Sequence, residues 1–221
     1  MALNLLMLGP PGAGKGTQAE RFARERRIPK ISTGDILREA VHDKTEIGQR
    51  AKAVMDRGEL VGDDVMIGIV GERLERQDAK DGFVLDGFPR TVAQAAALDR
   101  IMSQRDPLIV VDIVVPEEEL VRRLSTRSIC RLCGTGAPVG SAVGAACAKC
   151  GGRLVQRTDD NQAVVLERLK VYHRQSEPLV EYYRVRSTFR SIDGAQDPDR
   201  VAADLAAAIA AAGNGAARVQ G

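Results

Sequence analysis

The sequence predicts an α/β fold in which helices flank a parallel sheet in three layers. Of the 221 residues, 44% are hydrophobic, which is enough for one full core. Short apolar runs rich in β-forming residues alternate with longer helix-like stretches, and each run ends in Gly, Pro or Asp. Such alternation is typical of buried strands joined by right-handed crossovers. The apolar runs lie at 3–8, 83–85, 108–115 and 189–192.

Helix-start signals support the same fold class. Thr33 can cap a helix that begins near Asp35, and Asp63 opens the next long helical stretch. Asp197 followed by Pro198 provides a cap and a proline in the first turn of the last helix. These starts fit helices that alternate with the strands in an α/β layered fold.

Two segments interrupt the alternation and are predicted to be insertions over one edge of the sheet. Residues 32–61 have helical patterns and no predicted strand, and residues 124–158 are rich in Gly, Ala and Cys. The last residues are polar and Gly-rich, so they should fray. The expected organisation is a core of 1–31, 62–123 and 159–212, insertions at 32–61 and 124–158, and a frayed tail at 213–221.

The charge balance does not favour a nucleic-acid or membrane coat. The chain has 32 Lys and Arg residues and 30 Asp and Glu residues, a net charge of +2. Only 3% of residues are aromatic, which argues against a stacking platform for single-stranded nucleic acid. The first apolar run lacks a basic leader and is too short for a membrane span, so we expect a cytoplasmic protein.

The stretch GPPGAGKGT, Gly9 to Thr17, resembles a phosphate-binding loop. It matches G-x-x-x-x-G-K-[ST] except that Gly16 occupies the Ser/Thr position and Thr17 follows it. A strand before the loop and a helix after it would direct backbone N–H groups and the positive end of the helix dipole toward phosphate, and Lys15 adds a positive charge. The structural alternative is a tight turn with a surface lysine. We therefore predict nucleotide binding.

Several stretches together resemble the adenylate kinases over essentially the whole chain. They are, in order, GPPGAGKGTQA, ISTGDILR, LDGFPRT, the cysteine-bearing insertion and RTDDN. The family commonly has Gly at the position of Gly16. The resemblance implies a P-loop nucleoside monophosphate kinase fold with two small mobile domains, an AMP-binding insertion at 32–61 and a lid at 124–158. It also implies reversible transfer of a phosphoryl group from Mg-ATP to AMP, giving two ADP.

This reaction needs counter-charge and alignment more than a general base, because the accepting phosphate oxygen is already an anion. Guanidinium forks suit phosphate oxygens and stay protonated. For any single arginine, a solvated helix face is the alternative. Arginines lie beside the resembling motifs at Arg38, Arg90, Arg123, Arg127, Arg157 and Arg168.

The resemblance implies a role for each candidate residue. The expected catalytic residues are Lys15, Arg90, Arg127, Arg157 and Arg168. The expected ATP-binding residues are Gly12, Ala13, Gly14, Lys15, Gly16, Thr17, Arg123, which would pack on adenine, Arg127 and Gln196. The expected AMP-binding residues are Thr33, Arg38, Leu60, Val61, Gly87, Arg90, Gln94, which would read the adenine edge, Arg157 and Arg168.

Acidic residues and Thr33 refine this expectation. Asp86 follows an apolar strand and could hold Mg²⁺ through water. Asp35 and Asp159 could serve the same charge network or simply cap helices. The resemblance favours AMP as acceptor, because related uridylate and cytidylate kinases usually carry alanine at the position of Thr33.

The cysteines predict a structural zinc site in the lid. Cys130-x-x-Cys133 and Cys147-x-x-Cys150 place four thiolates in two tight turns, as in closed Cys₄ zinc sites. Another metal such as iron or cobalt, an adventitious reduced cluster, or disulfides are the alternatives. The resemblance agrees, since many bacterial adenylate kinases have a zinc-stapled lid. Thr126 and Ser128 stand where the family often has Gly and Arg.

Two classes of function follow. The first is an adenylate kinase with Mg²⁺, structural Zn²⁺ and the partners ATP, AMP and ADP, acting as a monomer without nucleic acid or membrane. A variant of it would use GTP as donor or another monophosphate as acceptor. The second is an ATP-gated binding module whose zinc ribbon contacts RNA or protein. The near-neutral charge and the arginine of DGFPR favour the kinase.

Overall fold

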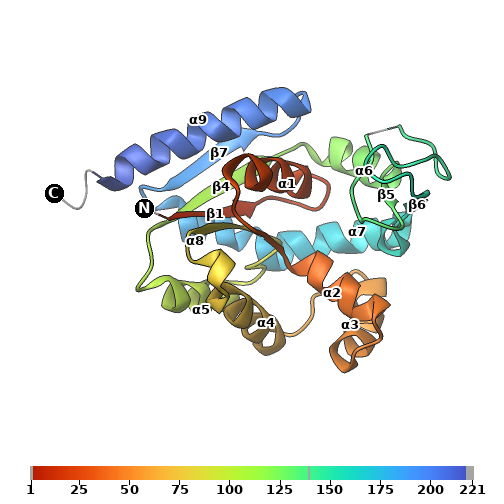
Figure 1. The fold of residues 1–221 in the computed structure, drawn as a ribbon, viewed down its shortest axis with the longest axis horizontal. Helices are drawn as coiled ribbons and strands as arrows, with labels where there is room; N and C mark the ends of the chain where they lie inside the picture. The colour runs from red at the N-terminus through yellow and green to blue at the C-terminus, as the bar shows by residue number, and fades with distance from the viewer. Residues whose placement is uncertain (1, 139, 218–221) are drawn as a thin grey trace.

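The computed structural model describes residues 2–138 and 140–217. Within them, five parallel strands form the central sheet in the order β2-β3-β1-β4-β7, with helices on both faces (Figure 1). This confirms the predicted α/β class. The strands are β1 (Leu3–Leu8), β2 (Lys30–Ser32), β3 (Gly82–Asp86), β4 (Leu108–Val114) and β7 (Phe189–Asp193).

Alternate side chains of each strand enter two separate hydrophobic cores. The helices that cover the sheet are α1 (Lys15–Arg26), α4 (Asp63–Glu75), α5 (Val92–Met102), α6 (Glu117–Ser125), α7 (Gln162–Val171), α8 (Pro178–Arg184) and α9 (Pro198–Ala217). Leu5 and Met7 of β1 pack on one face with side chains of α1, α6, α7 and α9, whereas Leu6 and Leu8 pack on the other face with α4, α5 and α8. Because both faces are buried, the strands read as continuous apolar runs.

The two insertion segments lie toward the same end of the molecule, away from both termini (Figure 1). Residues 32–61 contain α2 (Thr33–His42) and α3 (Glu46–Asp56). Residues 124–158 contain an antiparallel pair, β5 (Ser128–Cys130) and β6 (Leu154–Gln156). Short 3₁₀ turns at Gln77–Ala79 and Thr158–Asp160 follow α4 and β6.

Two predictions near β2 were wrong: this strand was missed, and the wrong residue was assigned as the cap of α2. Both features depend on contacts with residues distant in sequence. The three residues of β2 are too few for an apolar pattern, yet they pair in parallel with β3. Ser32, not Thr33, caps α2, and its hydroxyl oxygen accepts a hydrogen bond from the Asp35 N–H at 3.3 Å. The Thr33 hydroxyl instead donates to the carbonyl oxygen of Gly87 at 2.7 Å.

The last helix starts as predicted and ends later. The Asp197 carboxylate accepts a hydrogen bond from the Asp199 N–H at 2.8 Å, so the predicted cap is confirmed. The helix α9 continues through Ala217, past the start of the predicted tail at 213–221, and the fraying of that tail stays a prediction. The run of alanines before the tail has high helix propensity and carries the helix onward. Residues 218–221 lie outside the described part of the chain.

A π-helical turn, Tyr172–Ser176, joins α7 to α8. Pro178 has no N–H to continue an α-helical pattern, and the Glu177 N–H bonds to the Tyr172 carbonyl at 2.9 Å, five residues back. The turn directs the Ser176 hydroxyl to the carbonyl oxygen of Arg90 at 2.9 Å. It therefore ties α7 and α8 to the loop after β3.

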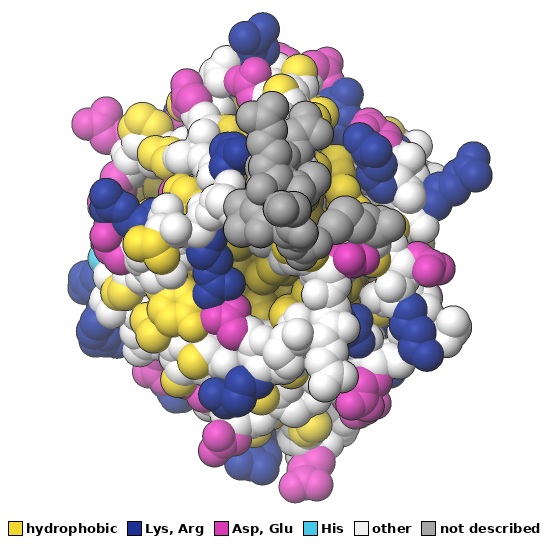
Figure 2. Space-filling view, turned by 90° about the vertical axis from the view of Figure 1, so that its left-hand side faces the viewer, with side chains coloured by type: hydrophobic (Ala, Val, Ile, Leu, Met, Phe, Trp, Pro, Cys, Tyr) yellow, Lys and Arg dark blue, Asp and Glu magenta, His cyan; other side chains and the backbone are white. Residues whose placement is uncertain are grey.

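The surface agrees with the balanced composition. Basic and acidic side chains are interspersed over the face on which both termini lie (Figure 2). Among residues 2–138 and 140–217, no helix combines the length and apolar character needed to cross a bilayer.

Two adjacent tyrosines on α8 differ in how their hydroxyls are satisfied. The Tyr182 hydroxyl donates to the Asp99 carboxylate at 2.6 Å, and Arg186 donates to the same carboxylate at 2.9 and 2.6 Å. The Tyr183 side chain is fully buried, and its hydroxyl has no hydrogen-bond partner among the described residues. A buried hydroxyl without a partner destabilises the fold.

We expect opposite effects from removing these hydroxyls. Tyr182→Phe should lower the free energy of unfolding by about 1.5 kcal/mol or more, because it deletes a hydrogen bond to a charged group. Tyr183→Phe should leave that free energy unchanged or raise it. Urea unfolding of both variants measures the difference. A larger loss in Tyr183→Phe than in Tyr182→Phe would contradict the assignment.

Candidate active site

The phosphate-binding loop joins β1 to α1 as the sequence predicts. Gly9 lies so close to β4 that a Cβ atom would come within 2.6 Å of the Ile113 carbonyl oxygen, so only glycine fits. Gly14 precedes α1 with φ 92°, a left-handed conformation. Gly12, Ala13, Gly16 and Thr17 complete the loop and the first turn of α1. The loop thus presents the N-terminus of α1 at the carboxyl edge of the sheet.

Lys15 folds back over this loop. Its ammonium donates hydrogen bonds to the carbonyl oxygens of Gly9 at 2.6 Å and Pro10 at 2.8 Å. Burial lowers the pKa of Lys15 to about 8, while the negative charge of Asp86 opposes the shift. An arriving phosphate would offer the ammonium a stronger partner than two neutral carbonyls.

Carboxylates from both strands that flank β1 lie beside the loop. Asp86 pairs in register with Met7, and a Cβ atom on Gly16 would come 3.3 Å from its carboxylate oxygen. This position fits the predicted role in holding Mg²⁺ through water. Asp112 pairs in register with Leu8 and was missed by the sequence interpretation. The only signal was a single acidic residue within an apolar strand.

Asp112 is a buried carboxylate near a buried ammonium. The residue is 6% exposed, and one of its carboxylate oxygens has no hydrogen-bond partner among the described residues. Burial raises the pKa of Asp112, and the positive charge of Lys15 opposes that shift. Lys15 therefore lies in a field shaped by carboxylates from β3 and β4.

The predicted AMP-binding motifs meet at Gly87. The Gly87 carbonyl oxygen accepts hydrogen bonds from the Thr33 hydroxyl at 2.7 Å and from Nε of Arg90 at 2.8 Å. Burial lowers the pKa of Arg90 to about 10, and the like charge of Arg168 contributes. The side chain of Gln94 accepts from the Arg90 N–H at 2.8 Å. The STGD and DGFPRT segments thus form one side of the site.

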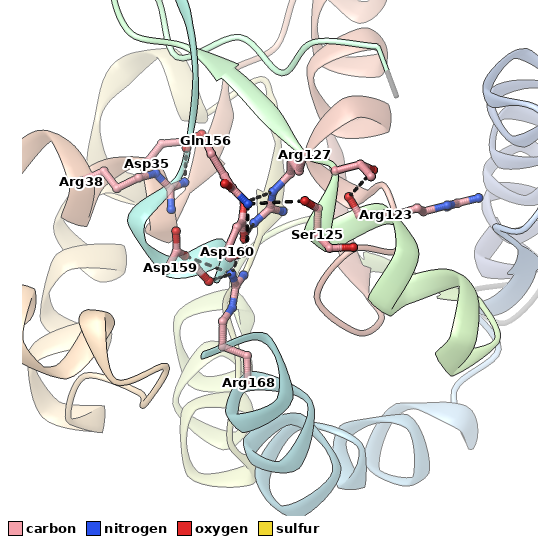
Figure 3. Close-up of polar contacts among 10 residues, drawn as sticks. Asp35, Arg38, Arg123, Ser125, Arg127, Gln156, Asp159, Asp160 and Arg168 are labelled. Atoms are coloured by element: carbon pink, nitrogen blue, oxygen red, sulfur yellow. Dashed lines mark hydrogen bonds and ion pairs between the residues drawn. The ribbon is translucent and has the colours of Figure 1, made fainter. Parts of the chain in front are cut away.

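Arg127 of the lid and Arg168 of α7 both bind the carboxylate of Asp160 (Figure 3). Asp160 is buried, with 1% of its surface exposed. Arg127 donates to it through Nε at 2.6 Å and also through Nη2. Arg168 of α7 donates to it at 3.0 Å and to the Asp159 carbonyl oxygen at 3.0 Å, and it forms an ion pair with the Asp159 carboxylate at 3.0 Å. Asp159, predicted either to join this network or to cap a helix, therefore pairs with an arginine.

Arg38 and Arg157 complete the cluster. Arg38 pairs with Asp35, which also contacts Lys30 at 3.1 Å, so Asp35 belongs to the charge network. Burial lowers the pKa of Arg157 to about 10, with the like charges of Arg127 and Arg38 adding to the effect. Nε of Arg157 is buried without a hydrogen-bond partner among the described residues. Such a group favours an incoming anion.

Two predicted ATP-binding side chains are not part of this cluster. Arg123 pairs with Glu119 on α6 at 2.7 Å and points away from the other arginines in Figure 3. Gln196 donates to the Asp193 carbonyl oxygen at 3.1 Å and to Asp204 at 2.9 Å. Both nevertheless belong to elements that border the phosphate loop.

Contacts of the loop glycines show this border. A Cβ atom on Gly12 would come 2.9 Å from the Leu124 side chain of α6. A Cβ atom on Gly194, two residues before Gln196, would come 3.3 Å from the Ala13 carbonyl oxygen. On the acceptor side, the half-buried Leu60 and Val61 lie in the loop before α4. The elements that carry Arg123 and Gln196 thus border the loop on two sides.

The cysteine sulfurs have the spacing of a metal site. All four lie within 4.8 Å of one another, with Cys130 and Cys150 at 3.4 Å and Cys133 and Cys147 at 3.8 Å. Zn–S bonds of about 2.3 Å in a tetrahedron place sulfurs about 3.8 Å apart, so the set fits zinc. None of the cysteines is in a disulfide. Four thiolates would fill all four coordination positions of a tetrahedral metal, so no position would remain for a substrate or a reactive water.

The lid core is too small to hold itself together. Only Cys130, Cys147 and Leu154 form its described buried cluster, with Ala137 packed against it. Such a cluster cannot offset the entropy of ordering the surrounding loops, whereas a metal can. The Thr126 hydroxyl donates to the Arg122 carbonyl oxygen at 2.9 Å and the Ser128 hydroxyl to the Ser141 carbonyl oxygen at 3.4 Å, so both hydroxyls make local hydrogen bonds.

A model of the adenylate kinase family matches residues 7–188. This chain belongs to the adenylate kinase family. It is 50% identical over 212 residues to an adenylate kinase of Archaeoglobus fulgidus, which covers 94% of this chain and 98% of that protein. It is 49% identical over 208 residues to an adenylate kinase of Staphylococcus epidermidis, with coverages of 92% and 97%.

A third relative, an adenylate kinase of Geobacter sp. strain M21, is 49% identical over 214 residues, with coverages of 95% and 100%. These comparisons confirm the resemblance and the nucleoside monophosphate kinase fold. Membership of the adenylate kinase family also makes the chain a phosphotransferase. The roles of individual site residues remain predictions.

The pKa of Lys15 predicts the pH dependence of ATP use. In the free enzyme Lys15 is charged below about pH 8 and neutral above it. The kcat/KM for ATP should therefore fall as pH rises through about 8, because that parameter reports the free enzyme. At saturating ATP, kcat should fall only at higher pH, since bound phosphate restores the charge. Initial rates from pH 6 to 10 measure both.

Lys15→Arg is the control, because a guanidinium stays charged throughout this range. In this variant, kcat/KM for ATP should show no fall near pH 8, whatever the overall rate of the variant. If that fall persists, a group other than Lys15 causes it.

Proposed function

We propose that this protein catalyses the reversible transfer of the γ-phosphoryl group from Mg-ATP to AMP, giving two ADP. Membership of the adenylate kinase family is the observation that carries the proposal. The convergence of buried cations beside a phosphate loop supports it, since two polyanions must meet in this reaction. A pure ATP-gated switch would not need Arg90 opposite the loop.

The donor phosphates would occupy the loop. Backbone N–H groups of residues 12–17 and the N-terminus of α1 offer hydrogen bonds to β and γ oxygens. Lys15 would exchange the carbonyls of Gly9 and Pro10 for phosphate oxygens. The partial positive charge of the N–H groups and the full charge of Lys15 would stabilise the negative charge that accumulates during transfer.

Bound Mg²⁺ would supply further charge neutralisation at the donor phosphates. Asp86 fits this ion because its carboxylate lies beside Gly16 and makes no ion pair within the described residues. Magnesium keeps several waters and needs few direct protein ligands, so one carboxylate acting through water suffices.

The arginines would align the two phosphates. Arg38 and Arg90 would bind the acceptor phosphate, and Arg127, Arg157 and Arg168 would approach from the lid and α7. The carboxylates of Asp159 and Asp160 hold Arg127 and Arg168 in place before substrates arrive. No general base is required, because the accepting oxygen of AMP is an anion.

Thr33 supports adenine as the acceptor base. Its single hydroxyl hydrogen is committed to the Gly87 carbonyl at 2.7 Å, so the oxygen can only accept further hydrogen bonds. An exocyclic amino group is a donor and suits such an oxygen. We propose that Leu60, Val61, Gly87 and Gln94 complete this pocket.

The lid would exclude water that could otherwise accept the phosphoryl group. Zinc bound to Cys130, Cys133, Cys147 and Cys150 would have only a structural role. ATP, AMP and ADP are the proposed partners. We propose a cytoplasmic monomer that binds neither nucleic acid nor membrane.

A coupled assay for ADP formation tests the reaction. ATP consumption should require AMP, and Lys15→Ala and Arg90→Ala should each lower kcat/KM by about 10²-fold or more. Arg76→Ala is the matched control, because Arg76 is an exposed arginine on the far end of α4. Comparison of ATP with GTP, and of AMP with CMP and UMP, defines donor and acceptor.

The proposal fails if AMP does not accelerate ATP consumption, or if both variants keep full activity with the fold intact. Salt-dependent RNA binding without phosphoryl transfer would instead favour the binding-module alternative.

Elemental analysis of protein purified without chelators tests the metal. We expect about one zinc per chain for a Cys₄ site. Cys130→Ser should lower the melting temperature and leave kcat of the folded protein nearly unchanged, because the metal stabilises the lid without touching substrate. Thr126→Ala, in the same segment, is the control. Absence of metal, or iron or cobalt in its place, would contradict the zinc assignment.

A further inference from the structure

The side-chain amide of Gln94 is clamped between two partners. Its Nε2 donates a hydrogen bond to the Asp63 carboxylate at 2.8 Å, and its Oε1 accepts one from the Arg90 N–H at 2.8 Å. The residue is 1% exposed. Sequence interpretation named Gln94 as a base-reading residue but gave Asp63 only a role at a helix start.

Both partners allow a single orientation of this amide. A carboxylate has no hydrogen to donate, so it must face the amide nitrogen of Gln94. A backbone N–H can only donate, so it must face the amide oxygen. Flipping the amide would break both hydrogen bonds and set oxygen against oxygen at Asp63. A buried group left without a partner makes such a flip costly.

Asp63 itself is held in place from a second direction. Its other carboxylate oxygen accepts a hydrogen bond from the Thr91 hydroxyl at 3.0 Å. The Thr91 hydroxyl oxygen in turn accepts from the Gln94 N–H at 3.2 Å and caps α5. The first residue of α4 thereby fixes both the backbone and the side chain of Gln94.

The orientation of an amide decides which purine edge it can read. An amide has two donor hydrogens and two acceptor lone pairs, so Gln94 keeps one N–H and one lone pair for a ligand. Adenine presents an amino donor at position 6 beside a ring-nitrogen acceptor, which an amide matches with its oxygen and nitrogen respectively. Guanine and hypoxanthine carry an acceptor oxygen at position 6, which would face the amide oxygen of Gln94 and be repelled.

We propose that Asp63 is a specificity-determining positioning residue, which locks the Gln94 amide in one orientation and so makes the enzyme select a 6-amino purine over a 6-oxo purine in its nucleoside monophosphate acceptor. This inference rests on the proposed function, because it requires Gln94 to face the acceptor base. Asp63 acts through Gln94 and needs no contact with the nucleotide.

The test compares AMP with inosine monophosphate, which has an oxygen in place of the amino group. The kcat/KM for each acceptor is measured with Mg-ATP for the wild type and Asp63→Asn. The asparagine side chain can offer either oxygen or nitrogen to Gln94, so the constraint from Asp63 is removed and only the Arg90 N–H still orients the amide. The AMP to IMP ratio of kcat/KM should fall by about tenfold or more. Asp63→Ala should lower the ratio as well.

Two control variants separate specificity from a structural effect. Asp63→Glu keeps an acceptor-only group and should retain most of the ratio. Asp64→Asn removes an exposed charge from the same first turn of α4 and should leave the ratio unchanged. Thermal melts check that each variant is folded.

The outcomes are distinguishable. Equal losses with AMP and IMP in Asp63→Asn and Asp63→Ala would make Asp63 merely structural and overturn the inference. A wild-type enzyme that phosphorylates AMP and IMP equally would also overturn it, while leaving phosphoryl transfer intact. A wild type that fails to phosphorylate AMP would remove the proposed function itself.

Discussion

Repulsion between buried positive charges is the constraint around which this site is built. Lys15, Arg90, Arg157 and Arg168 lie close enough that burial and their like charges lower their pKa values. Holding them together costs stability in the free protein. Asp159 and Asp160 offset part of that cost, but Arg90 and Arg157 make no ion pair within the described residues. The uncompensated charge is what a pair of phosphates would relieve.

The fold distributes this cost over separate elements. The cations come from α1, α2, the loop after β3, the lid and α7, so no single helix carries the repulsion. Parallel strands direct all of these loops toward one edge of the sheet. Asp86 of β3 and Asp112 of β4 lie on either side of β1, the strand that precedes the phosphate loop.

Features written in local sequence could be predicted, and features created by tertiary contact could not. The phosphate loop, the long strands and the cysteine pairs each carry their own pattern of residues. The strand β2 does not, because three residues acquire their state from pairing with β3. For the same reason Ser32 displaced Thr33 as the cap, since Gly87 lies within reach of the Thr33 hydroxyl. Asp63 and Asp112 acquire their importance only from neighbours distant in sequence.

The π-helical turn between α7 and α8 has a mechanical consequence. Arg168 stands on one side of it, and Ser176, inside it, bonds to the Arg90 carbonyl oxygen at 2.9 Å. Arg168 and the backbone of Arg90 are thus connected to one helical segment that runs from α7 through α8. A tilt of that segment would move both residues together, so the distance between them would be preserved.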